Sequence, residues 1–503
     1  HQLEGSVQYH IPAVLQLSGD LNIPALQRSM QSIINRHEVL RTLILEHEEQ
    51  PYQYILDKDS WQLQLINASE HDDDTLRLLI HELITQPFDL TKDHMLRAHL
   101  VQLKEQEQIL VVTLHHIASD GWSRSIIVKE LAALYASYTE DSEYVPPHLP
   151  VQYADYALWQ RKYLAGPVLE EKIAYWQEQL TGVSPLQLPT DHPYQPVKST
   201  SGAVVGFSID SELTTQLRSL ALQQGATLYM TLLAAFKVLM HKYSGQQDIC
   251  IGAPVAGRQQ QETESLVGFF INTVALRSDL SNDPSFITLL QQVKHVTLDA
   301  FEQQDAPFEK VVEAVVKDRD LARDPIFQVL FTLQNTPDMP DLVLGEVSLA
   351  GQGTAQTTTQ FEISLVLMES PAGIGAQVIY SSNLFEKDTM LRMSEHYVTL
   401  LRSVVEWPAQ KISSLNMLSE AEQHQLLHGF NDTAVPYADK TLVDLFEEQV
   451  QRTPLAVAVK FRDSQLTYKE LDERTNQLAH YLRKREVKQE SLVAICLDRS
   501  LEM

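Results

Sequence analysis

The sequence predicts an α/β protein in which two α/β units of similar size precede the beginning of a third domain. Segments with apolar residues at helical spacing alternate with short apolar runs, a pattern typical of mixed helix and sheet. The pattern runs through residues 1–181, stops in a stretch rich in Gly, Pro, Ser and Thr at 182–202, and resumes through 203–407. Two such units suggest a pseudo-dimer, and the cleft between them is a preferred place for a ligand.

The first unit is predicted to open with an amphipathic helix at 24–34. Its apolar residues share one face: Leu26, Met30, Ile33 and Ile34. Pro24 suits the first turn of this helix, because the missing N–H would have no partner there. Strands are predicted at 51–56, 96–103 and 109–114. Two more helices are expected, one after residue 120 and one that carries Trp176 and Leu180 on one side.

The second unit, 203–407, repeats the alternation of helices and strands. Its helices are predicted at 211–224, 227–243, 285–303 and 386–405. Its strands are predicted at 248–252, 269–276, 326–334, 361–369 and 374–380. A second linker is expected at 408–440, where turn-forming residues recur. From 441 to 503 the pattern changes again, and 492–497 is typical of a buried strand, so we expect this part to be the truncated start of another domain.

Composition excludes several classes of function. The chain carries 39 basic and 66 acidic residues, a formal net charge of −27, which argues against nucleic acid or an anionic membrane surface as the partner. No apolar run approaches the ~18 residues of a membrane helix. The N-terminus lacks the features of a signal peptide, and we expect the chain to be part of a longer protein. Cysteine is limited to Cys250 and Cys496, which predicts a reducing, cytoplasmic setting.

The most informative local pattern spans residues 113–123. Two adjacent histidines, His115 and His116, end an apolar strand, and Asp120 and Gly121 follow after three residues. Histidine is the commonest general base, and the end of a strand holds a side chain rigidly. Neighbours in a strand face opposite sides, so one histidine should face a cleft and the other the packing. No metal site is expected, because the sequence has neither an HExxH motif nor closely spaced cysteines.

Six motifs in order resemble those of a known family. They are Arg36 to Thr42 (RHEVLRT), His115 to Gly121 (HHIASDG), Tyr153 to Trp159 (YADYALW), Val267 to Arg277 (VGFFINTVALR), Gln304 to Glu309 (QDAPFE) and Arg319 to Phe327 (RDLARDPIF). The chain resembles the condensation domains of nonribosomal peptide synthetases, and 466–471 (LTYKEL) resembles the first motif of adenylation domains. The resemblance implies two chloramphenicol-acetyltransferase-like subdomains in a V, a tunnel between them, and a partial adenylation N-terminal subdomain.

The resemblance also implies a reaction and its partners. The amine of an acceptor aminoacyl thioester would attack a donor aminoacyl or peptidyl thioester, each tethered to the phosphopantetheine of a carrier protein. Donor and acceptor peptidyl carrier proteins are therefore the implied partners, together with the rest of the adenylation domain in the full-length synthetase. No cofactor is expected on this fragment, because it lacks the glycine-rich phosphate loop and the later lysine of adenylation domains.

The resemblance assigns roles within the histidine motif. His116 is the implied catalytic residue, either as the base that takes a proton from the attacking amine or as the group that holds this amine in line. His115 is implied to be structural. Asp120 is implied to hold its loop through an arginine, and Arg41 and Arg277 are the candidates.

Four further residues are candidates for contact with the tunnel or the substrate. Gly121 would leave room for the acceptor arm, and its amide could donate to the thioester oxygen. Trp122 directly follows Gly121 and is a candidate for the same contact. Ser123 is expected either at the tunnel or as the N-cap of the following helix. Asn272 is a polar residue in an apolar strand, so it should either face the tunnel or bridge to the opposite subdomain.

Three alternative functions stay open. An epimerisation domain of the same fold needs a second acid or base, usually a glutamate, and lacks the GxFxNT arrangement present at 268–273. A non-catalytic recruitment module would keep the fold for protein docking. A free acyltransferase that uses coenzyme A would have no need of the adenylation-like tail.

Overall fold

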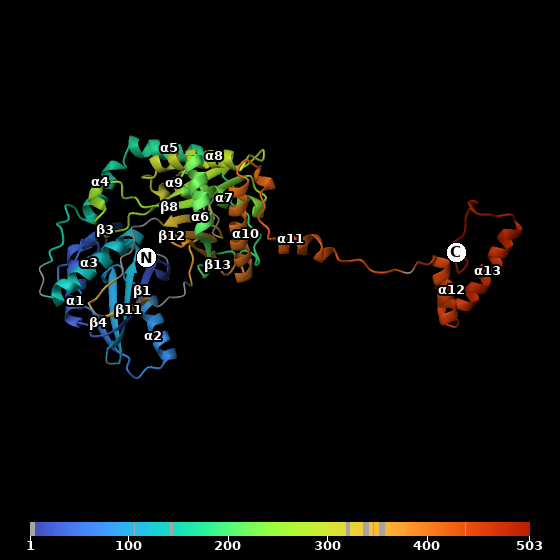
Figure 1. Ribbon diagram of the computed structural model, residues 1–503, viewed down its shortest axis with the longest axis horizontal. Helices are drawn as coiled ribbons and strands as arrows, with labels where there is room; N and C mark the ends of the chain where they lie inside the picture. The colour runs from blue at the N-terminus through green and yellow to red at the C-terminus, as the bar shows by residue number, and fades with distance from the viewer. Residues whose placement is uncertain are drawn as a thin grey trace. The chain divides into compact units, whose positions relative to one another are not determined.

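The chain forms two compact units, one from His1 to Glu420 and one from Ala421 to Met503. The computed structural model describes residues 6–104, 106–140, 144–317, 322–334, 342–345, 347–351, 358–437 and 439–503. The motif expected at 319–327 therefore lies partly outside the described residues. Figure 1 labels many of the helices and strands of the larger unit and the helices α12 and α13 of the smaller one.

The first half of the larger unit is built on a β-sheet with the strand order β11-β1-β6-β5-β4. Its strands are β1 (His10–Ser18), β4 (Gln64–Asn67), β5 (Leu96–Lys104), β6 (Glu107–His115) and β11 (Ser348–Gly351). β6 lies between β1 and β5 and is antiparallel to both. Its residues are mostly buried, because helices cover both faces of this sheet. A separate hairpin pairs β2 (Thr42–His47) with β3 (Gln50–Ile55).

Three helices cover this sheet. α1 (Ile23–Arg36) and α3 (Gly121–Thr139) pack against each other and share a core with Leu17, Leu100 and Leu110 of the strands. On the other face, α2 (Asp73–Thr85) packs with the alternate strand residues. The side chain of Asn22 caps α1 by accepting from the backbone N–H of Ala25 at 3.0 Å, and Pro24 lies in the first turn as predicted.

The second half is built on a larger sheet with the order β7-β13-β12-β10-β8-β9. Its strands are β7 (Gly202–Asp210), β8 (Asp248–Val255), β9 (Asn272–Asp279), β10 (Val329–Gln334), β12 (Ile363–Ser370) and β13 (Gly373–Ser381). β10 is parallel to β8 and β12, and the remaining pairs are antiparallel. The second half is therefore a mixed sheet.

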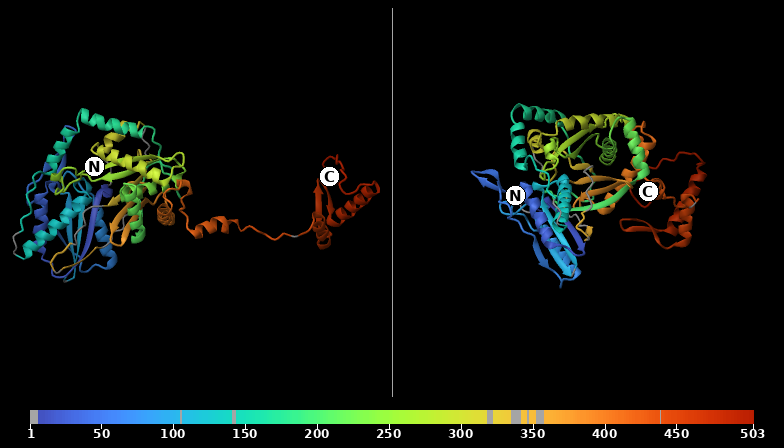
Figure 2. Two further views of the ribbon diagram at one scale, coloured as in Figure 1. Left: turned by 45° about the horizontal axis from the view of Figure 1, so that its top comes forward. Right: turned by 60° about the vertical axis from the view of Figure 1, so that its left-hand side comes forward.

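Helices surround this second sheet and connect it to the first half. They are α4 (Tyr153–Tyr163), α5 (Pro167–Leu180), α6 (Ser211–Gln223), α7 (Leu228–Ser244), α8 (Phe286–Glu302), α9 (Phe308–Val315) and α10 (Lys387–Glu406). α7 is buried along most of its length, as its largely apolar sequence requires. The two views in Figure 2 show α4 and α5 leading from the first half to the second.

One short strand crosses between the halves. β11 follows β10 in the chain, yet it pairs with β1 in the first sheet, with Leu17 opposite Leu349. The two halves are therefore interlocked, and the first sheet is completed by residues from the second half of the sequence.

The predicted helices of the second half agree with α6, α7, α8 and α10 within one residue at each end. The predicted strand at 269–276 begins three residues too early, because β9 starts at Asn272. Two residues of the predicted second linker, Ile412 and Leu415, are buried in the core of the second half.

The smaller unit holds α12 (Leu442–Arg452), β14 (Val457–Phe461), β15 (Ser464–Thr467) and α13 (Tyr468–Lys484). α11 (Glu420–Leu427) precedes them. The expectation of a buried strand at 492–497 is wrong: these residues have no regular structure and are exposed. β14 and β15 pair with each other only, so this apolar segment has no strand to pair with in the described chain.

Candidate active site

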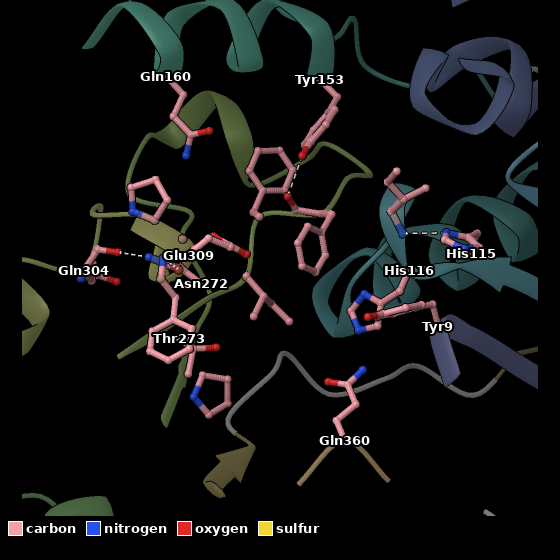
Figure 3. A pocket seen from close by; sticks show the side chains of 18 of the residues that line it. Tyr9, His115, His116, Tyr153, Gln160, Asn272, Thr273, Gln304, Glu309 and Gln360 are labelled. Atoms are coloured by element: carbon pink, nitrogen blue, oxygen red, sulfur yellow. Dashed lines mark hydrogen bonds between the residues drawn. The ribbon is translucent and has the colours of Figure 1, made fainter. Parts of the chain in front are cut away.

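A cavity of about 700 Å³ lies where the two halves of the larger unit meet. The first half contributes Tyr9, Phe88, His115 and His116, and the second contributes residues from β8, β9, α9 and the segment around Phe361. Figure 3 shows His116 and Tyr9 on one side of the cavity and Asn272 and Gln304 on the other. The expectation of a cleft between the two halves is confirmed.

His116 points into this cavity from the end of β6. The strand ends at His115, and His116 begins a single 3₁₀ turn, His116–Ala118. The ring packs edge-on against Phe269 with 5.1 Å between centroids. Its Nδ1 is buried without a hydrogen-bond partner in the described chain. Nε2 is therefore the ring nitrogen available to a substrate, and no carboxylate among the described residues is paired with this imidazole.

His115 lines the same cavity, which corrects the expectation that the two histidines face opposite sides. The period of two applies only within a strand, and the chain leaves the strand between them. The Nδ1 of His115 accepts from the backbone N–H of Ile117 at 3.1 Å, so the proton of the neutral ring is on Nε2. Burial, with smaller contributions from His10 and His116, lowers the pKa of His115 to about 4. His115 is thus uncharged at neutral pH.

Asp120 joins the two halves of the unit. Its Oδ1 accepts from the backbone N–H and the hydroxyl of Ser123, at 2.8 and 2.7 Å, and from Arg258 at 3.1 Å. Its Oδ2 accepts from Arg258 and from the backbone N–H of Phe270, both at 3.2 Å. With five hydrogen bonds and 1% exposure, this carboxylate is fully occupied and serves structure.

The arginine that pairs with Asp120 is Arg258, and the prediction of Arg41 or Arg277 is wrong. Arg41 bonds to the Leu56 carbonyl and to Glu38. Arg277 forms a two-bond pair with Asp248 at 2.8 and 2.9 Å and also donates to carbonyls at the end of α5. Both arginines therefore tie local elements together, away from the histidine motif.

Arg258 belongs to the segment 256–271, which connects β8 to β9. Its guanidinium also donates to the carbonyls of Thr263 and Leu266 at 2.5 and 2.7 Å, and lies 4.1 Å above the ring of Phe270. Arg258 thus folds its own segment and fastens it to Asp120. The sequence carries only a weak signal for it: a lone arginine directly after Gly257, in an acidic chain.

Ser123 is not the N-cap of α3, contrary to one of the two expectations. Asp120 is the N-cap, since its side chain accepts from the N–H of Ser123. The Ser123 hydroxyl bonds across the junction as well, accepting from the Gly268 N–H at 3.1 Å. Its single proton is shared between Asp120 Oδ1 at 2.7 Å and the Gly268 carbonyl at 3.0 Å. Trp122 also bonds across, from its indole N–H to the Glu264 carbonyl at 2.9 Å.

Gly121, Trp122 and Ser123 are not among the residues that line the 700 Å³ cavity. A Cβ placed on Gly121 would have no atom within 4 Å. Contact between these three residues and a substrate arm stays a prediction.

Asn272 does line the cavity, at the start of β9. Its Nδ2 donates to the carbonyls of Gln304 and Ala306, at 2.6 and 2.7 Å, and its Oδ1 accepts from the N–H of Phe308 at 3.2 Å. These bonds hold the 304–308 turn within the second half, so Asn272 bridges within its own half of the unit rather than to the opposite one.

Other motif residues meet at the same junction. His37 bonds to Glu130 of α3 at 3.0 Å, and its Nδ1 accepts from the N–H of Val267 at 3.5 Å. The Tyr153 hydroxyl donates to the Phe269 carbonyl at 2.7 Å. Residues of the motifs 36–42, 115–121 and 153–159 therefore all bond to the segment 256–271.

The described part of the chain contains no group of three His, Cys, Asp or Glu side chains that could hold a metal ion. Among the described helices, none is both long and apolar enough to cross a membrane.

Two family models match the chain. The condensation-domain model matches residues 1–427, and the AMP-binding-enzyme model matches residues 446–503. A linear gramicidin synthase protein of Brevibacillus parabrevis is 42% identical over 509 residues, covering 100% of this chain and 10% of that protein. Malpinin synthetase of Mortierella alpina is 39% identical over 507 residues, covering 100% of this chain and 6% of that protein. The chain thus spans a tenth or less of these relatives.

Solved structures share the fold. The X-domain from teicoplanin biosynthesis superposes with a TM-score of 0.74 at 27% identity, over 82% of this chain and 93% of that one. A four-domain nonribosomal peptide synthetase bound to AMP and glycine gives a TM-score of 0.83 at 21% identity, over 96% of this chain and 38% of that one. The fold is accordingly chloramphenicol-acetyltransferase-like. The chain belongs to the condensation-domain family of nonribosomal peptide synthetases and continues into a fragment of the AMP-binding family.

Proposed function

We propose that this chain forms amide bonds between two thioester-bound substrates, with His116 as the catalytic residue. One observation carries the proposal: an imidazole with a free ring nitrogen projects into a cavity at the junction of the two halves. The family assignment and the relatives, which are nonribosomal peptide synthetases, support the same chemistry.

The reaction balances without an external oxidant or cofactor. The nitrogen of the acceptor amine forms a bond to the donor carbonyl carbon, and the carbonyl π electrons move to oxygen. The ammonium nitrogen then loses a proton, and the oxyanion electrons re-form the carbonyl as the C–S bond breaks. The departing thiolate takes up one proton, equal to the one that the nitrogen released, and leaves as a thiol. The products are one amide and one free thiol.

His116 acts on the amine in one of two ways. As a general base it takes the proton through Nε2, a contribution of ~10²–10⁴ in rate. As a positioning group it holds the amine in line with the carbonyl, which can contribute as much. Because no carboxylate of the described chain orients the ring, the packing of Phe269 against it sets its direction.

The proposed partners are donor and acceptor carrier proteins, which present the substrates on phosphopantetheine arms. The rest of an adenylation domain is the proposed partner of residues 441–503. The relatives support both proposals, since they are synthetases far longer than this chain.

The test is a single-turnover reaction between carrier proteins loaded with aminoacyl-pantetheine groups, read by intact mass spectrometry. Wild type is expected to form a dipeptidyl carrier. His116→Ala should reduce the rate by ~10²–10⁴ while the thermal unfolding temperature stays unchanged. Equal rates in wild type and variant would contradict the proposal.

The same assay detects epimerisation, which is the second candidate function. One observation supports this candidate. Glu309 lines the cavity as a carboxylate with no hydrogen-bond partner in the described chain, and an epimerase needs a second acid or base. In D₂O, exchange at the α-carbon without peptide would identify epimerisation. Neither exchange nor peptide with several substrate pairs would point to a recruitment module.

A further inference from the structure

Four side-chain amides line the cavity, and they differ in how they are bonded. They are Gln160, Asn272, Gln304 and Gln360. Gln160 donates to the Tyr156 hydroxyl at 3.2 Å, Gln304 donates to the Phe301 carbonyl at 2.6 Å, and both N–H groups of Asn272 are held by carbonyls. Within the described part of the chain, the amide of Gln360 has no partner. It is the one amide of the four with neither N–H group bonded in the described chain.

Gln360 faces the catalytic histidine. Figure 3 shows its side chain rising from the floor of the cavity with the amide directed toward the ring of His116. Both residues line the same cavity but come from opposite halves of the unit. A substrate carbonyl presented to an amine beside His116 would therefore lie between these two side chains.

The backbone beneath Gln360 is fastened on both sides. The Lys198 ammonium donates to the Gln360 carbonyl and to both oxygens of Asp324, the latter at 2.6 Å each. The N–H of Thr359 donates to the Thr200 carbonyl at 2.9 Å. On the other side, the N–H of Glu362, a residue 3% exposed, donates to the Gln328 carbonyl at 3.0 Å. These bonds hold the backbone from which the exposed Gln360 side chain projects, so the side chain starts from a fixed point at the cavity.

We propose that Gln360 is a second catalytic residue, whose Nε2–H donates to the donor thioester oxygen and stabilises the oxyanion. This inference rests on the proposed function, since it assigns the step in which the carbonyl π electrons move to oxygen. The bond strengthens as the charge develops, because a hydrogen bond to an ionised acceptor is about twice as strong as a neutral one. Oxyanion donors of this kind contribute ~10²–10³ to kcat.

The alternative use of the amide, as an acceptor for the amine, is less well supported by the surroundings. The cavity already holds acceptors for an amine proton, His116 and the carboxylate of Glu309. Each of the other three amides is already held by at least one hydrogen bond of its N–H groups, as described above. Gln360 differs from them because its whole amide has no partner in the described chain.

The experiment compares Gln360→Met and Gln360→Glu in the single-turnover assay. Methionine keeps the length of the side chain and removes the N–H, so kcat should fall ~10²–10³ with KM within about threefold. Glutamate removes the N–H and adds a negative charge, so its kcat should fall at least as far. Gln223→Met, on an exposed face of α6, is the matched control and should keep the wild-type rate.

Two results of this assay would overturn the proposal. An unchanged kcat in Gln360→Met, or a change in KM alone, would show that the N–H does not act in the transition state. A glutamate variant that keeps the wild-type rate while methionine loses it would show that the amide oxygen acts on the amine.

A binding measurement separates failure of this proposal from failure of the proposed function. The probe is a pantetheine-linked phosphonamidate, whose anionic oxygens imitate the tetrahedral intermediate. Wild type should bind it about tenfold more tightly than Gln360→Met, and the glutamate variant should bind most weakly. If wild type forms no peptide, the proposed function is wrong. The affinity for the probe still tests whether Gln360 donates a hydrogen bond to an anionic oxygen. Equal affinities in wild type and Gln360→Met would overturn the donor role, whether or not peptide forms.

Discussion

At the scale of single residues, His116 and Asp120 belong to one short motif but have different roles. His116 presents a ring nitrogen to the cavity, whereas Asp120 gives all its hydrogen-bonding capacity to Ser123, Arg258 and Phe270. The resemblance to condensation domains implied His116 as the residue for the chemistry. It could not indicate the partner of Asp120, because Arg258 is 138 residues further along the chain.

Replacing Asp120 by alanine should destabilise the larger unit by about 3–5 kcal/mol, because it leaves the guanidinium of Arg258 buried without its counter-ion. Denaturant unfolding measures this loss. The double variant Asp120→Ala, Arg258→Met should be more stable than the single Asp120→Ala. A single variant within about 0.5 kcal/mol of wild type would contradict the structural role of the pair.

Gly268 is a second residue on which the junction depends. A Cβ at this position would lie 2.3 Å from the ring of Tyr153 and 2.7 Å from that of Phe270. Gly268→Ala should therefore cost about 1–3 kcal/mol of unfolding free energy through overpacking.

Gly121→Ala is the matched control for that prediction, since its new methyl group would meet no atom within 4 Å. Thermal unfolding of the two variants compares them directly. If both unfold at the wild-type temperature, the close packing of the segment 256–271 does not contribute to stability.

At the scale of elements, the core of the second half contains a buried lysine between α7 and β9. Lys237 is fully buried and donates to the Leu276 carbonyl at 2.6 Å and the Ser278 hydroxyl at 2.7 Å. Burial lowers its pKa to about 7. A neutral amine has two N–H groups, which matches the two acceptors, so the site suits the uncharged form.

This lysine should make stability rise with pH above neutrality. Between pH 7 and about 10.5 the unfolded chain binds the proton and the folded chain does not, so the unfolding free energy increases by up to ~1.4 kcal/mol per pH unit. Lys237→Met should remove this contribution to the slope. Unfolding between pH 7 and 8.5 is the measurement, since the Cys250 thiol, whose burial raises its pKa to about 12, adds an opposite slope at higher pH.

The absolute stability of Lys237→Met is not the readout, because the variant also leaves two acceptors without their donor. A slope equal to that of wild type would show that Lys237 keeps its proton in the folded protein.

The long helices were predictable at this scale because each buries one face against a sheet, which imposes a period of 3.6 residues on its own sequence. α6, α8 and α10 follow that rule, whereas α7 is buried on all sides and was predictable from its long apolar run. The prediction of a strand at 492–497 was wrong. Apolar composition shows that a strand could form there, whereas its pairing depends on a neighbouring strand elsewhere in the chain.

At the scale of the whole molecule, all residues that line the cavity belong to the unit that ends at Glu420. A chain that stops after Leu427, at the end of α11 and of the condensation-domain match, should therefore keep amide formation within about twofold of the 503-residue chain. The single-turnover assay measures it. A loss of tenfold or more, with the shortened chain still folded, would mean that residues 428–503 contribute to the reaction.

The sequence by itself determined the α/β class and the order of the two units, because these depend on periodicity within short stretches. Its motifs also carried the resemblance to condensation domains, and that resemblance implied His116 as the catalytic residue. Only the tertiary structure decided that Asp120 pairs with Arg258, that β11 completes the first sheet, and that Gln360 faces His116. Each of these contacts joins residues of the two halves that lie more than a hundred positions apart. The choice of partner is set by how the halves pack, and a single sequence carries no local pattern for that.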